Sequence, residues 1–573
     1  IDAGAQQIVK VEVPESWKNA QSEDLSVKHD GEGKLIDYVN DVLVPINQFR
    51  GMQLPVSTFE AYQTGEVPLG SSAFEKRGIA IDVPVWNNET CIECGNCSYV
   101  CPHACIRPVI LTKEELDNAP EGIRYQNAMQ LDGYYYAMAI SVYDCTGCGS
   151  CVNVCPGKKG EKALVMANME ENAAEQDIFD FGREIEVKPE VVAKFKPETV
   201  KGSQFKQPLL EFSGACAGCG ETPYAKLVTQ LFGDRMYIAN ATGCSSIWGG
   251  SAPATPYTTN AKGQGPAWAN SLFEDNAEFG LGMFTGQNTL REQTKEKVVA
   301  LAESTDNADV KAAAAEYLDT YADGSKNGAA TDKLVAALEA CGCDAAKEIL
   351  AKKEFLSKKS QWIFGGDGWA YDIGFGGVDH VLASGEDVNV FVFDTEVYSN
   401  TGGQASKSTN LGAIAQFQAA GKGTKKKDLA AIAMSYGYVY VAQIAMGADY
   451  NQTVKAIAEA EAYPGPSLVI GYAPCINHGI KGGMKIAQTE EKKAVTSGYW
   501  NLFRFNPALA AEGKNPFHLD SKAPTTEYED FIMGEVRYNA LSRQNPERAK
   551  ELFAEAKANA EAKYNRLKEM SDK

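Results

Sequence analysis

Two nearly identical cysteine runs carry the clearest chemical signal in this chain. The spacing C-x2-C-x2-C-x3-C-P occurs over residues 91–102 and again over residues 145–156. Thiolates at this spacing are ligands of [4Fe–4S] clusters, and in two-cluster proteins the fourth cysteine of each run binds the other cluster. The prediction is therefore one cluster on Cys91, Cys94, Cys97 and Cys155, and a second on Cys145, Cys148, Cys151 and Cys101.

Structural zinc is the alternative for these two runs. Zinc takes four ligands, usually as two separated pairs, and two contiguous four-cysteine runs match that pattern poorly. The doubled run resembles that of bacterial-type ferredoxins, so we expect residues 73–189 to form a ferredoxin-like α+β domain with two [4Fe–4S] clusters. Such a domain transfers electrons.

A second candidate site follows a predicted strand further along the chain. The phrase GGDGW occupies residues 365–369, and a second predicted strand ends in DTEVYSNTGG, residues 394–403. A strand-terminal GDG followed by an Asn-bearing loop is typical of thiamine diphosphate sites, although GDG alone also occurs in plain strand-to-turn connections. Mg²⁺ bridging a diphosphate prefers oxygen ligands, and the carboxylate of Asp367, an oxygen of Thr395 and the backbone carbonyl of Val397 can supply them.

A third cysteine group belongs to the same part of the sequence. Cys216 and Cys219 form a C-x2-C pair, Cys244 follows in the phrase ATGCS, and Cys475 lies far downstream in YAPCINH. Four thiolates at loop positions suit zinc or a [4Fe–4S] cluster, and a redox disulfide at the C-x2-C pair is a third possibility. The context favours the cluster, because an oxidative thiamine reaction beside a two-cluster relay needs an entry point for electrons. The remaining cysteines, Cys105, Cys341 and Cys343, are expected to be free thiols.

Alternating strands and helices from about residue 203 onward must position these residues. Apolar runs predict five buried strands, at residues 235–239, 361–365, 388–393, 438–444 and 467–472. Helical patterns lie at 223–232, 453–462 and 546–568, and an Ala-, Lys- and Glu-rich stretch at about 293–360 predicts an exposed helical insertion. This alternation is typical of a doubly wound, mostly parallel α/β sheet, which we assign to residues 190–573 as the thiamine diphosphate-binding domain.

The other segments are expected to connect or cover these domains. Residues 1–72 are predicted to be the end of a preceding domain and a connecting arm, with a strand at Val9–Val13 and a short helix at Leu35–Val44. The Gly- and Pro-containing residues 65–70 are typical of a linker. Residues 106–144, between the cysteine runs, predict an insertion with a strand at 134–138 that covers a cluster or contacts the neighbouring domain.

Composition limits the classes of function. The chain has 573 residues, of which 44% are hydrophobic and 23% charged, as expected for a soluble globular protein of several domains. No apolar run is long enough to span a bilayer, so no membrane partner is expected. The formal net charge of −20 argues against a nucleic-acid partner. Many thiols and low-potential clusters favour a reducing cytoplasm.

Together these motifs closely resemble the C-terminal half of the pyruvate:ferredoxin oxidoreductase family. The resemblance covers essentially the whole chain. It is carried by Thr90–Pro102, Asp144–Pro156, Ser213–Tyr224, Ala241–Gly249, Gly365–Gly377, Asp394–Lys407 and Gly471–Gly483.

The resemblance implies roles for individual residues. Cys216, Cys219, Cys244 and Cys475 would hold a proximal [4Fe–4S] cluster. The thiamine diphosphate site would be lined by Glu221, Thr242, Cys244, Gly366, Asp367, Gly368, Trp369 and Asn400. Glu221 and Asn400 are the catalytic candidates, and we expect Asn400 to make a polar contact with the substrate. The alternative for Asn400 is an asparagine that caps the turn beside Gly402.

The resemblance also implies an activity, the oxidative decarboxylation of pyruvate with coenzyme A to acetyl-CoA and CO2. Electrons would pass from thiamine diphosphate through three [4Fe–4S] clusters to ferredoxin or flavodoxin, reversibly in principle. The alternatives are the same chemistry on another 2-oxoacid, or an electron-transfer subunit only.

Part of the family's machinery is not visible in this sequence. Thiamine diphosphate binds in that family between two α/β domains, and only the one that holds the diphosphate is present here. The activating glutamate, the substrate-binding arginine and most of the coenzyme A site belong to a preceding half. Because the sequence opens at Ile1 without methionine, we expect that half to be a separate or cleaved chain, and the complete enzyme to be a homodimer.

Overall fold

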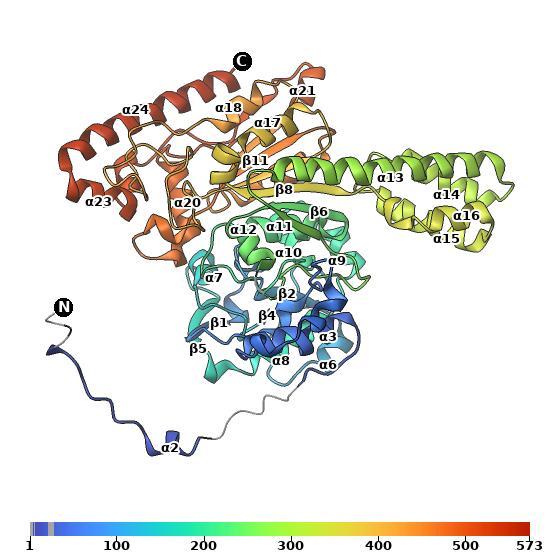
Figure 1. Ribbon diagram of the computed structural model, residues 1–573, viewed down its shortest axis with the longest axis horizontal. Coiled ribbons are helices and arrows are strands. Elements are labelled where there is room, and N and C mark those ends of the chain that lie inside the picture. The colour runs from blue at the N-terminus through green and yellow to red at the C-terminus, as the bar shows by residue number, and fades with distance from the viewer. Residues whose placement is uncertain (1–3, 5, 21–27, 252) are drawn as a thin grey trace. The chain divides into compact units, whose positions relative to one another are not determined.

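The computed structural model describes residues 4, 6–20, 28–251 and 253–573 (Figure 1). Contacts divide the chain into two units, residues 1–68 and 69–573. In the first unit α3 (Lys34–Tyr38), the π-helical η1 (Val39–Leu43) and α4 (Val44–Asn47) form one continuous helix, which confirms the helix predicted there. The strand predicted at Val9–Val13 is wrong: these residues are exposed and irregular. The described residues of this unit contain no strand with which that segment could pair, and an isolated strand is unstable in water.

Two small antiparallel sheets build the region of the paired cysteine runs. β1 (Asp82–Trp86) pairs with β5 (Leu164–Asn168). β2 (Ile106–Leu111) pairs with β4 (Tyr135–Ile140), which also pairs with β3 (Gln126–Asn127). The first cysteine run contains α5 (Asn96–Tyr99) and the second contains α7 (Ser150–Val154), and the fourth cysteine of each run follows its helix. Because β1 precedes the first run and β5 follows the second, their pairing brings the two runs together, as the ferredoxin-like α+β prediction requires.

An eight-stranded sheet forms the centre of the remaining residues, in the order β13-β12-β10-β11-β9-β8-β6-β7 (Figure 1). Six strands are parallel: β6 (Met236–Ala241), β7 (Ala267–Ser271), β8 (Ser360–Gly366), β9 (Asn389–Asp394), β10 (Tyr440–Ile444) and β11 (Ser467–Tyr472). β12 (Phe503–Phe505) and β13 (Phe517–Leu519) extend the sheet in antiparallel fashion. All five predicted strands are present, and the doubly wound α/β prediction is confirmed.

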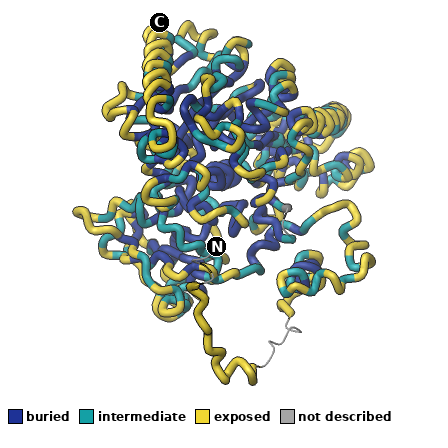
Figure 2. The backbone as a smooth tube through the Cα atoms, turned by 60° about the vertical axis from the view of Figure 1, so that its left-hand side comes forward, coloured by how far each residue is buried: buried dark blue, intermediate teal, exposed yellow. Residues whose placement is uncertain are grey.

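Helices cover both faces of this sheet, which is why its parallel strands are apolar throughout. Alternate residues of β9 point to opposite faces. Val390 and Val392 pack in the core beneath α13 (Asn276–Ser304), α17 (Phe375–Ala383) and α18 (Leu429–Met434). Phe391 and Phe393 pack in the core beneath α11 (Thr222–Phe232) and α19 (Tyr450–Ala462). Figure 2 shows the buried backbone concentrated in the interior of this unit.

The outer end of α13 leaves the sheet and joins a separate helical cluster (Figure 1). This cluster contains α14 (Ala308–Asp319), α15 (Asn327–Cys341) and α16 (Asp344–Leu350). It has its own small core around Tyr317, Leu334 and Leu338. The helices therefore occupy the predicted insertion at about 293–360, but the first of them begins on the sheet at Asn276.

Four C-terminal helices pack on the α13 face of the sheet. They are α20 (Ala487–Thr496), α22 (Tyr528–Ile532), α23 (Val536–Gln544) and α24 (Pro546–Ser571). The short α21 (Ala508–Ala511) has no buried residue. The other helices are α2 (Glu15–Lys18), α6 (Lys113–Asp117), α8 (Glu175–Glu184), α9 (Pro189–Lys194), α10 (Val200–Phe205) and α12 (Cys244–Ser246). None of the described helices is long and apolar enough to cross a membrane.

Candidate diphosphate and iron–sulfur sites

The predicted residues meet at one edge of the eight-stranded sheet. Four neighbouring parallel strands, β11, β9, β8 and β6, have their carboxyl ends there. They are followed by Cys475, Thr395, Asp367 and Cys244, in that order. The carboxyl ends of adjacent parallel strands form a common crevice in α/β folds. The topology therefore brings together residues that are far apart in the sequence.

Three oxygen-bearing groups converge between β8 and β9. The Asp367 carboxylate accepts hydrogen bonds from the backbone N–H (3.2 Å) and the hydroxyl (3.0 Å) of Thr395. The Thr395 hydroxyl also lies 3.1 Å from the Val397 carbonyl oxygen. All three residues are buried. These are the groups predicted to bind Mg²⁺, and the donor set is the one that a hard cation prefers.

Electrostatics favour a cation at this position. Burial raises the pKa of Asp367 well above its ordinary value, and the nearby Asp394 carboxylate raises it further. Lys426 pairs with Asp394 (2.9 Å), whereas Asp367 accepts only N–H and hydroxyl donors. Asp367 is therefore the carboxylate of this pair that a divalent ion would balance, and the residues present fit such an ion.

Two hydroxyl groups of this site were not predicted from the sequence. Ser406 donates to Asp367 Oδ2 (2.5 Å), and Ser399 lies 2.5 Å from the Thr395 hydroxyl. Both belong to the loop that follows β9. The density of Ser and Thr in residues 395–409 was the available signal, but hydroxyl-rich loops are common and carry no specific spacing.

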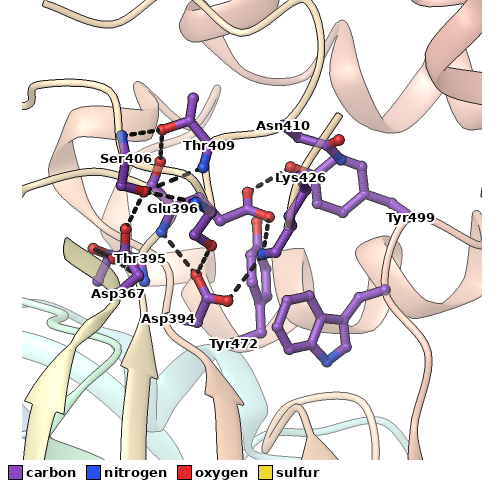
Figure 3. A network of polar contacts seen from close by, with 12 residues as sticks. Asp367, Asp394, Thr395, Glu396, Ser406, Thr409, Asn410, Lys426, Tyr472 and Tyr499 are labelled. Carbon is purple, nitrogen blue, oxygen red and sulfur yellow. Dashed lines mark hydrogen bonds and ion pairs between the residues drawn. The ribbon is translucent and has the colours of Figure 1, made fainter. Parts of the chain in front are cut away.

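A buried ionic network stabilises the loop that follows β9 (Figure 3). Lys426 donates to Asp394 (2.9 Å) and to Glu396 (2.8 Å), and Arg537 of α23 donates to the other oxygen of Glu396 (2.8 Å). Glu396 has a φ of 60°, a left-handed conformation that is uncommon for a residue other than glycine. Two cations fixed on its carboxylate offset that cost and hold the pKa of Glu396 low, at about 2 despite complete burial.

His478 connects the Cys475 loop to the Thr395 loop. Its Nε2 lies 2.7 Å from the Thr395 carbonyl oxygen, and its Nδ1 accepts the backbone N–H of Cys475 (3.5 Å). Because a carbonyl can only accept, the proton is on Nε2. Burial lowers the pKa of His478 to about 3, so the ring is neutral and works as a fixed link between the two loops.

The four cysteines of the third group share one neighbourhood. Burial raises the pKa of the Cys244 thiol, and Glu221, Cys219, Cys475 and Cys216 raise it further. The Cys219 sulfur accepts the backbone N–H of Glu221 (3.4 Å), and the Cys475 sulfur accepts the Asn477 amide (3.6 Å). N–H groups aimed at sulfur are typical of cluster-binding loops. No disulfide is formed within this group.

The paired runs surround two small cavities in the crossed arrangement that was predicted. One has a volume of about 20 Å³, and its lining includes the cysteines Cys91, Cys94, Cys97 and Cys155. The other also has a volume of about 20 Å³, and its lining includes Cys101, Cys145, Cys148 and Cys151. Among the described residues, no three Cys, His, Asp or Glu side chains are close enough to hold a single metal ion. Four sulfurs around a cavity fit a polynuclear cluster better than one zinc ion.

The insertion between the runs covers the first of these cavities. Tyr136 and Met138 of β4 line it. Glu93, inside the first run, accepts the backbone N–H of Met129 (3.0 Å) and the side-chain amide of Gln126 (2.8 Å). The insertion is thereby attached to the loop that carries the cysteines.

The other predicted site residues occupy varied positions around the crevice. Glu221 is buried, accepts the Trp248 indole N–H (2.8 Å) and has a pKa raised by burial to about 7. Thr242 is exposed and donates to the Ser271 carbonyl (2.8 Å). A Cβ at Gly368 would lie 2.5 Å from the Tyr398 ring. Trp369 is buried, and Gly366 ends β8.

Asn400 lies exposed on the loop after β9. The turn-capping alternative requires a hydrogen bond from its side chain to the backbone, and the hydrogen bonds among the described residues include none. The structure therefore does not support the turn-capping alternative, and a contact between Asn400 and the substrate stays a prediction.

The three remaining cysteines are free thiols. Cys105 donates to the His103 carbonyl (3.4 Å), and Cys341 donates to Cys343 (3.0 Å).

Segments of the chain match three known protein families. Residues 87–158 match a 4Fe-4S dicluster domain, residues 336–470 match the C-terminal TPP binding domain of thiamine pyrophosphate enzymes, and residues 27–80 match a domain of unknown function named EKR. The first two matches agree with the clusters and the thiamine cofactor inferred from the motifs.

Curated relatives are similar along the whole chain. The pyruvate-flavodoxin oxidoreductase of Enterobacter agglomerans is 52% identical over 100% of this chain and 48% of its own length. The pyruvate:ferredoxin oxidoreductase of Moorella thermoacetica is 52% identical over 100% of this chain and 49% of its own length. The mitochondrial pyruvate dehydrogenase [NADP(+)] of Euglena gracilis is 45% identical over 98% of this chain and 31% of its own length. The resemblance drawn from the motifs is confirmed, and the chain spans about half the length of the first two relatives.

Proposed function

We propose that this chain supplies the diphosphate-binding and electron-transferring part of an enzyme that decarboxylates pyruvate oxidatively. In the proposed reaction pyruvate and coenzyme A give acetyl-CoA and CO2, and two electrons leave through [4Fe–4S] clusters to flavodoxin or ferredoxin. One observation carries this proposal. The oxygens of Asp367 and Thr395 follow β8 and β9, and the flanking strands β6 and β11 bring Cys244 and Cys475 to the same crevice.

The named relatives support the choice of substrate and carrier. Those of E. agglomerans and M. thermoacetica are named for pyruvate and for flavodoxin or ferredoxin. Because the chain spans about half of their length, we assign the activity to a larger enzyme. In this proposal an N-terminal half, separate or cleaved, carries the aminopyrimidine-binding domain, and the complete enzyme is a cytoplasmic homodimer.

The residues of the crevice would hold the thiamine cofactor. When bound, thiamine diphosphate supplies the nucleophilic carbon and the electron sink for decarboxylation of a 2-oxoacid. Asp367, Thr395 and Val397 would bind Mg²⁺ at the diphosphate, and Gly366 and Gly368 would allow the backbone to approach it. Glu221, Thr242, Cys244 and Trp369 would line the site. Asn400 would contact the substrate through its exposed amide.

The cysteines would form a path for single electrons. Cys216, Cys219, Cys244 and Cys475 would hold the proximal [4Fe–4S] cluster next to the thiamine site. The two sulfur-lined cavities of the paired runs would hold the other two clusters. Backbone N–H groups on the sulfurs of Cys91 and Cys145, each at 3.4 Å, would stabilise the thiolate ligands.

An anaerobic carrier-reduction assay on the complete enzyme tests the proposal. We expect flavodoxin or ferredoxin to be reduced in the presence of pyruvate, dependent on coenzyme A, at least tenfold faster than with 2-oxoglutarate. If the carrier is reduced with 2-oxoglutarate but not with pyruvate, the assignment of the substrate is wrong. Failure to retain thiamine diphosphate after incubation with Mg²⁺ would leave an electron-transfer subunit and overturn the catalytic role.

A further inference from the structure

Lys226 places a buried positive charge against the first cysteine run. It lies on α11 of the sheet domain and is only 1% exposed. Its ammonium group donates to the carbonyl oxygen of Ser98 in α5, which lies between Cys97 and Cys101 in the sequence. A residue of the thiamine diphosphate-binding domain thus reaches into the cysteine loop of the ferredoxin-like domain.

The ammonium group has no carboxylate to balance it. In the part of the chain that the structure describes, no Asp or Glu oxygen forms an ion pair with Lys226. The ionisable groups that act on it most strongly are the thiols of Cys101, Cys97 and Cys105 and the guanidinium of Arg107. Arg107 is itself paired with Glu211. A buried, unpaired charge is costly, and burial lowers the pKa of Lys226 to about 8.

The thiols near Lys226 belong to both predicted clusters. Cys101 lines the cavity of the second run, and Cys97 lines the cavity of the first. A [4Fe–4S] cluster ligated by four thiolates is anionic, and adding one electron makes it more so. A fixed cation nearby therefore stabilises the reduced form more than the oxidised form, since the interaction energy grows with the cluster's charge.

We propose that Lys226 is a positioning residue for electron transfer, whose buried ammonium raises the reduction potentials of both clusters in the ferredoxin-like domain. The proposal rests on the proposed function, because it requires clusters on the paired runs. Electrons released by substrate oxidation at the thiamine site would reach these two clusters one at a time through the proximal cluster, and would leave from them to flavodoxin or ferredoxin. The charge of Lys226 makes acceptance from the proximal cluster more favourable.

Variants at Lys226 separate its charge from its hydrogen bond. Lys226→Gln removes the charge and retains an N–H donor for Ser98, Lys226→Met removes both, and Lys226→Arg retains the charge. Lys206→Met is the control, because Lys206 is a half-buried lysine that also donates to a backbone carbonyl, that of Leu231 (3.0 Å). Its charged neighbours are Asp234, Arg235 and Glu198, with no thiol among them.

The measurement is an electron-spin-resonance redox titration of the complete, cluster-loaded enzyme, together with its iron content. We call the two clusters of the paired runs the relay clusters. For Lys226→Gln and Lys226→Met we expect the equilibrium constant for one-electron reduction of each relay cluster to fall at least tenfold. This change lowers the midpoint potential by about 59 mV. Lys226→Arg should shift them much less, and Lys206→Met should not shift them. The signal of the proximal cluster should move least.

Several results would overturn this role. Unchanged midpoints in both neutral variants at full iron content would exclude tuning by charge, as would an equal shift in Lys206→Met. Loss of iron from the paired runs in both neutral variants, with normal midpoints for the remaining cluster, would assign Lys226 to folding. Absence of relay clusters in the unmodified enzyme would instead refute the proposed function itself.

Discussion

Asp367 is the residue on which the predicted diphosphate site depends. We expect Asp367→Asn to weaken Mg²⁺-dependent retention of thiamine diphosphate by the complete enzyme at least tenfold, because a neutral amide replaces the charged oxygen ligand. Equilibrium dialysis at fixed Mg²⁺ measures this directly. Asp379→Asn is the control, since Asp379 lies on α17 and accepts the Tyr436 hydroxyl (2.8 Å) rather than belonging to the crevice. Equal losses in the two variants would contradict the assignment.

The buried carboxyl group of Glu491 predicts how the stability of the folded protein depends on pH. It is fully buried, accepts the Gly447 N–H (2.8 Å) and the Tyr224 hydroxyl (3.2 Å), and burial raises its pKa from 4.5 to about 8. Between these two values the folded state holds a proton that the unfolded state has lost. Stability therefore falls as pH rises from about 5 to about 8, by up to about 1.4 kcal/mol per pH unit.

Replacing this carboxyl removes the titration. The unfolding temperature of Glu491→Gln should be close to that of the unmodified protein at pH 5 and increasingly above it toward pH 8. Thermal unfolding of both proteins across that range measures the difference. A difference that stays constant with pH would show that Glu491 is ionised in the folded protein.

Single residues differ in how far the sequence predicts them. Asp367, Thr395 and Val397 follow strand ends and carry the oxygens that a hard cation requires. Their residue types and their places in the sequence therefore predict the same site. Ser406 and His478 reach the site from loops whose path is set by tertiary packing, and neither has a characteristic spacing to Asp367. The left-handed conformation of Glu396 (φ 60°) also has no local signal, because Lys426 and Arg537 stabilise it from elsewhere in the chain.

At the scale of elements, Gly280 determines how closely α13 approaches the sheet. A Cβ at this position would lie 2.5 Å from Ile363 of β8 and 3.0 Å from Ala239 of β6. We expect Gly280→Ala to lower the free energy of unfolding by about 1–3 kcal/mol, as overpacking of a core does. Gly282→Ala in the same helix is the control, because no atom lies within 4 Å of its added Cβ. It should stabilise the helix by about 0.5–1 kcal/mol. Chemical denaturation that ranks the two variants in the opposite order would show that α13 does not sit this tightly on the sheet.

Burial explains which elements were predictable. β8, β9, β10 and β11 are buried almost throughout and appear in the sequence as continuous apolar runs. β7 was missed because AWANS lies at the sheet edge, where its residues are exposed or only half-buried. β12 and β13 have three residues each, too few to show a period. The helical insertion was predicted only from about residue 293, because the first turns of α13 lie on the sheet while its later turns belong to the projecting cluster.

At the scale of the whole molecule, the fold joins two kinds of site through shared contacts. The ferredoxin-like region meets the sheet domain where Lys226 contacts Ser98 and where the Tyr99 hydroxyl donates to the Tyr450 carbonyl (3.2 Å). The sequence predicted both domains from their motifs, but not these contacts, since they depend on how two separately recognisable folds pack together.

Replacing Cys475 tests whether the electron path begins at a proximal cluster beside the eight-stranded sheet. Three [4Fe–4S] clusters correspond to about twelve iron atoms per chain. Cys475→Ser in the complete enzyme should lower the iron content by about a third, remove one electron-spin signal and slow pyruvate-dependent carrier reduction more than thiamine diphosphate binding. Cys343→Ser is the control: it removes a free thiol in the helical insertion and should retain all the iron. Unchanged iron in Cys475→Ser would leave Cys216, Cys219 and Cys244 as a zinc or redox site, and the two relay clusters would then have no iron–sulfur donor at the carboxyl ends of β6, β8, β9 and β11.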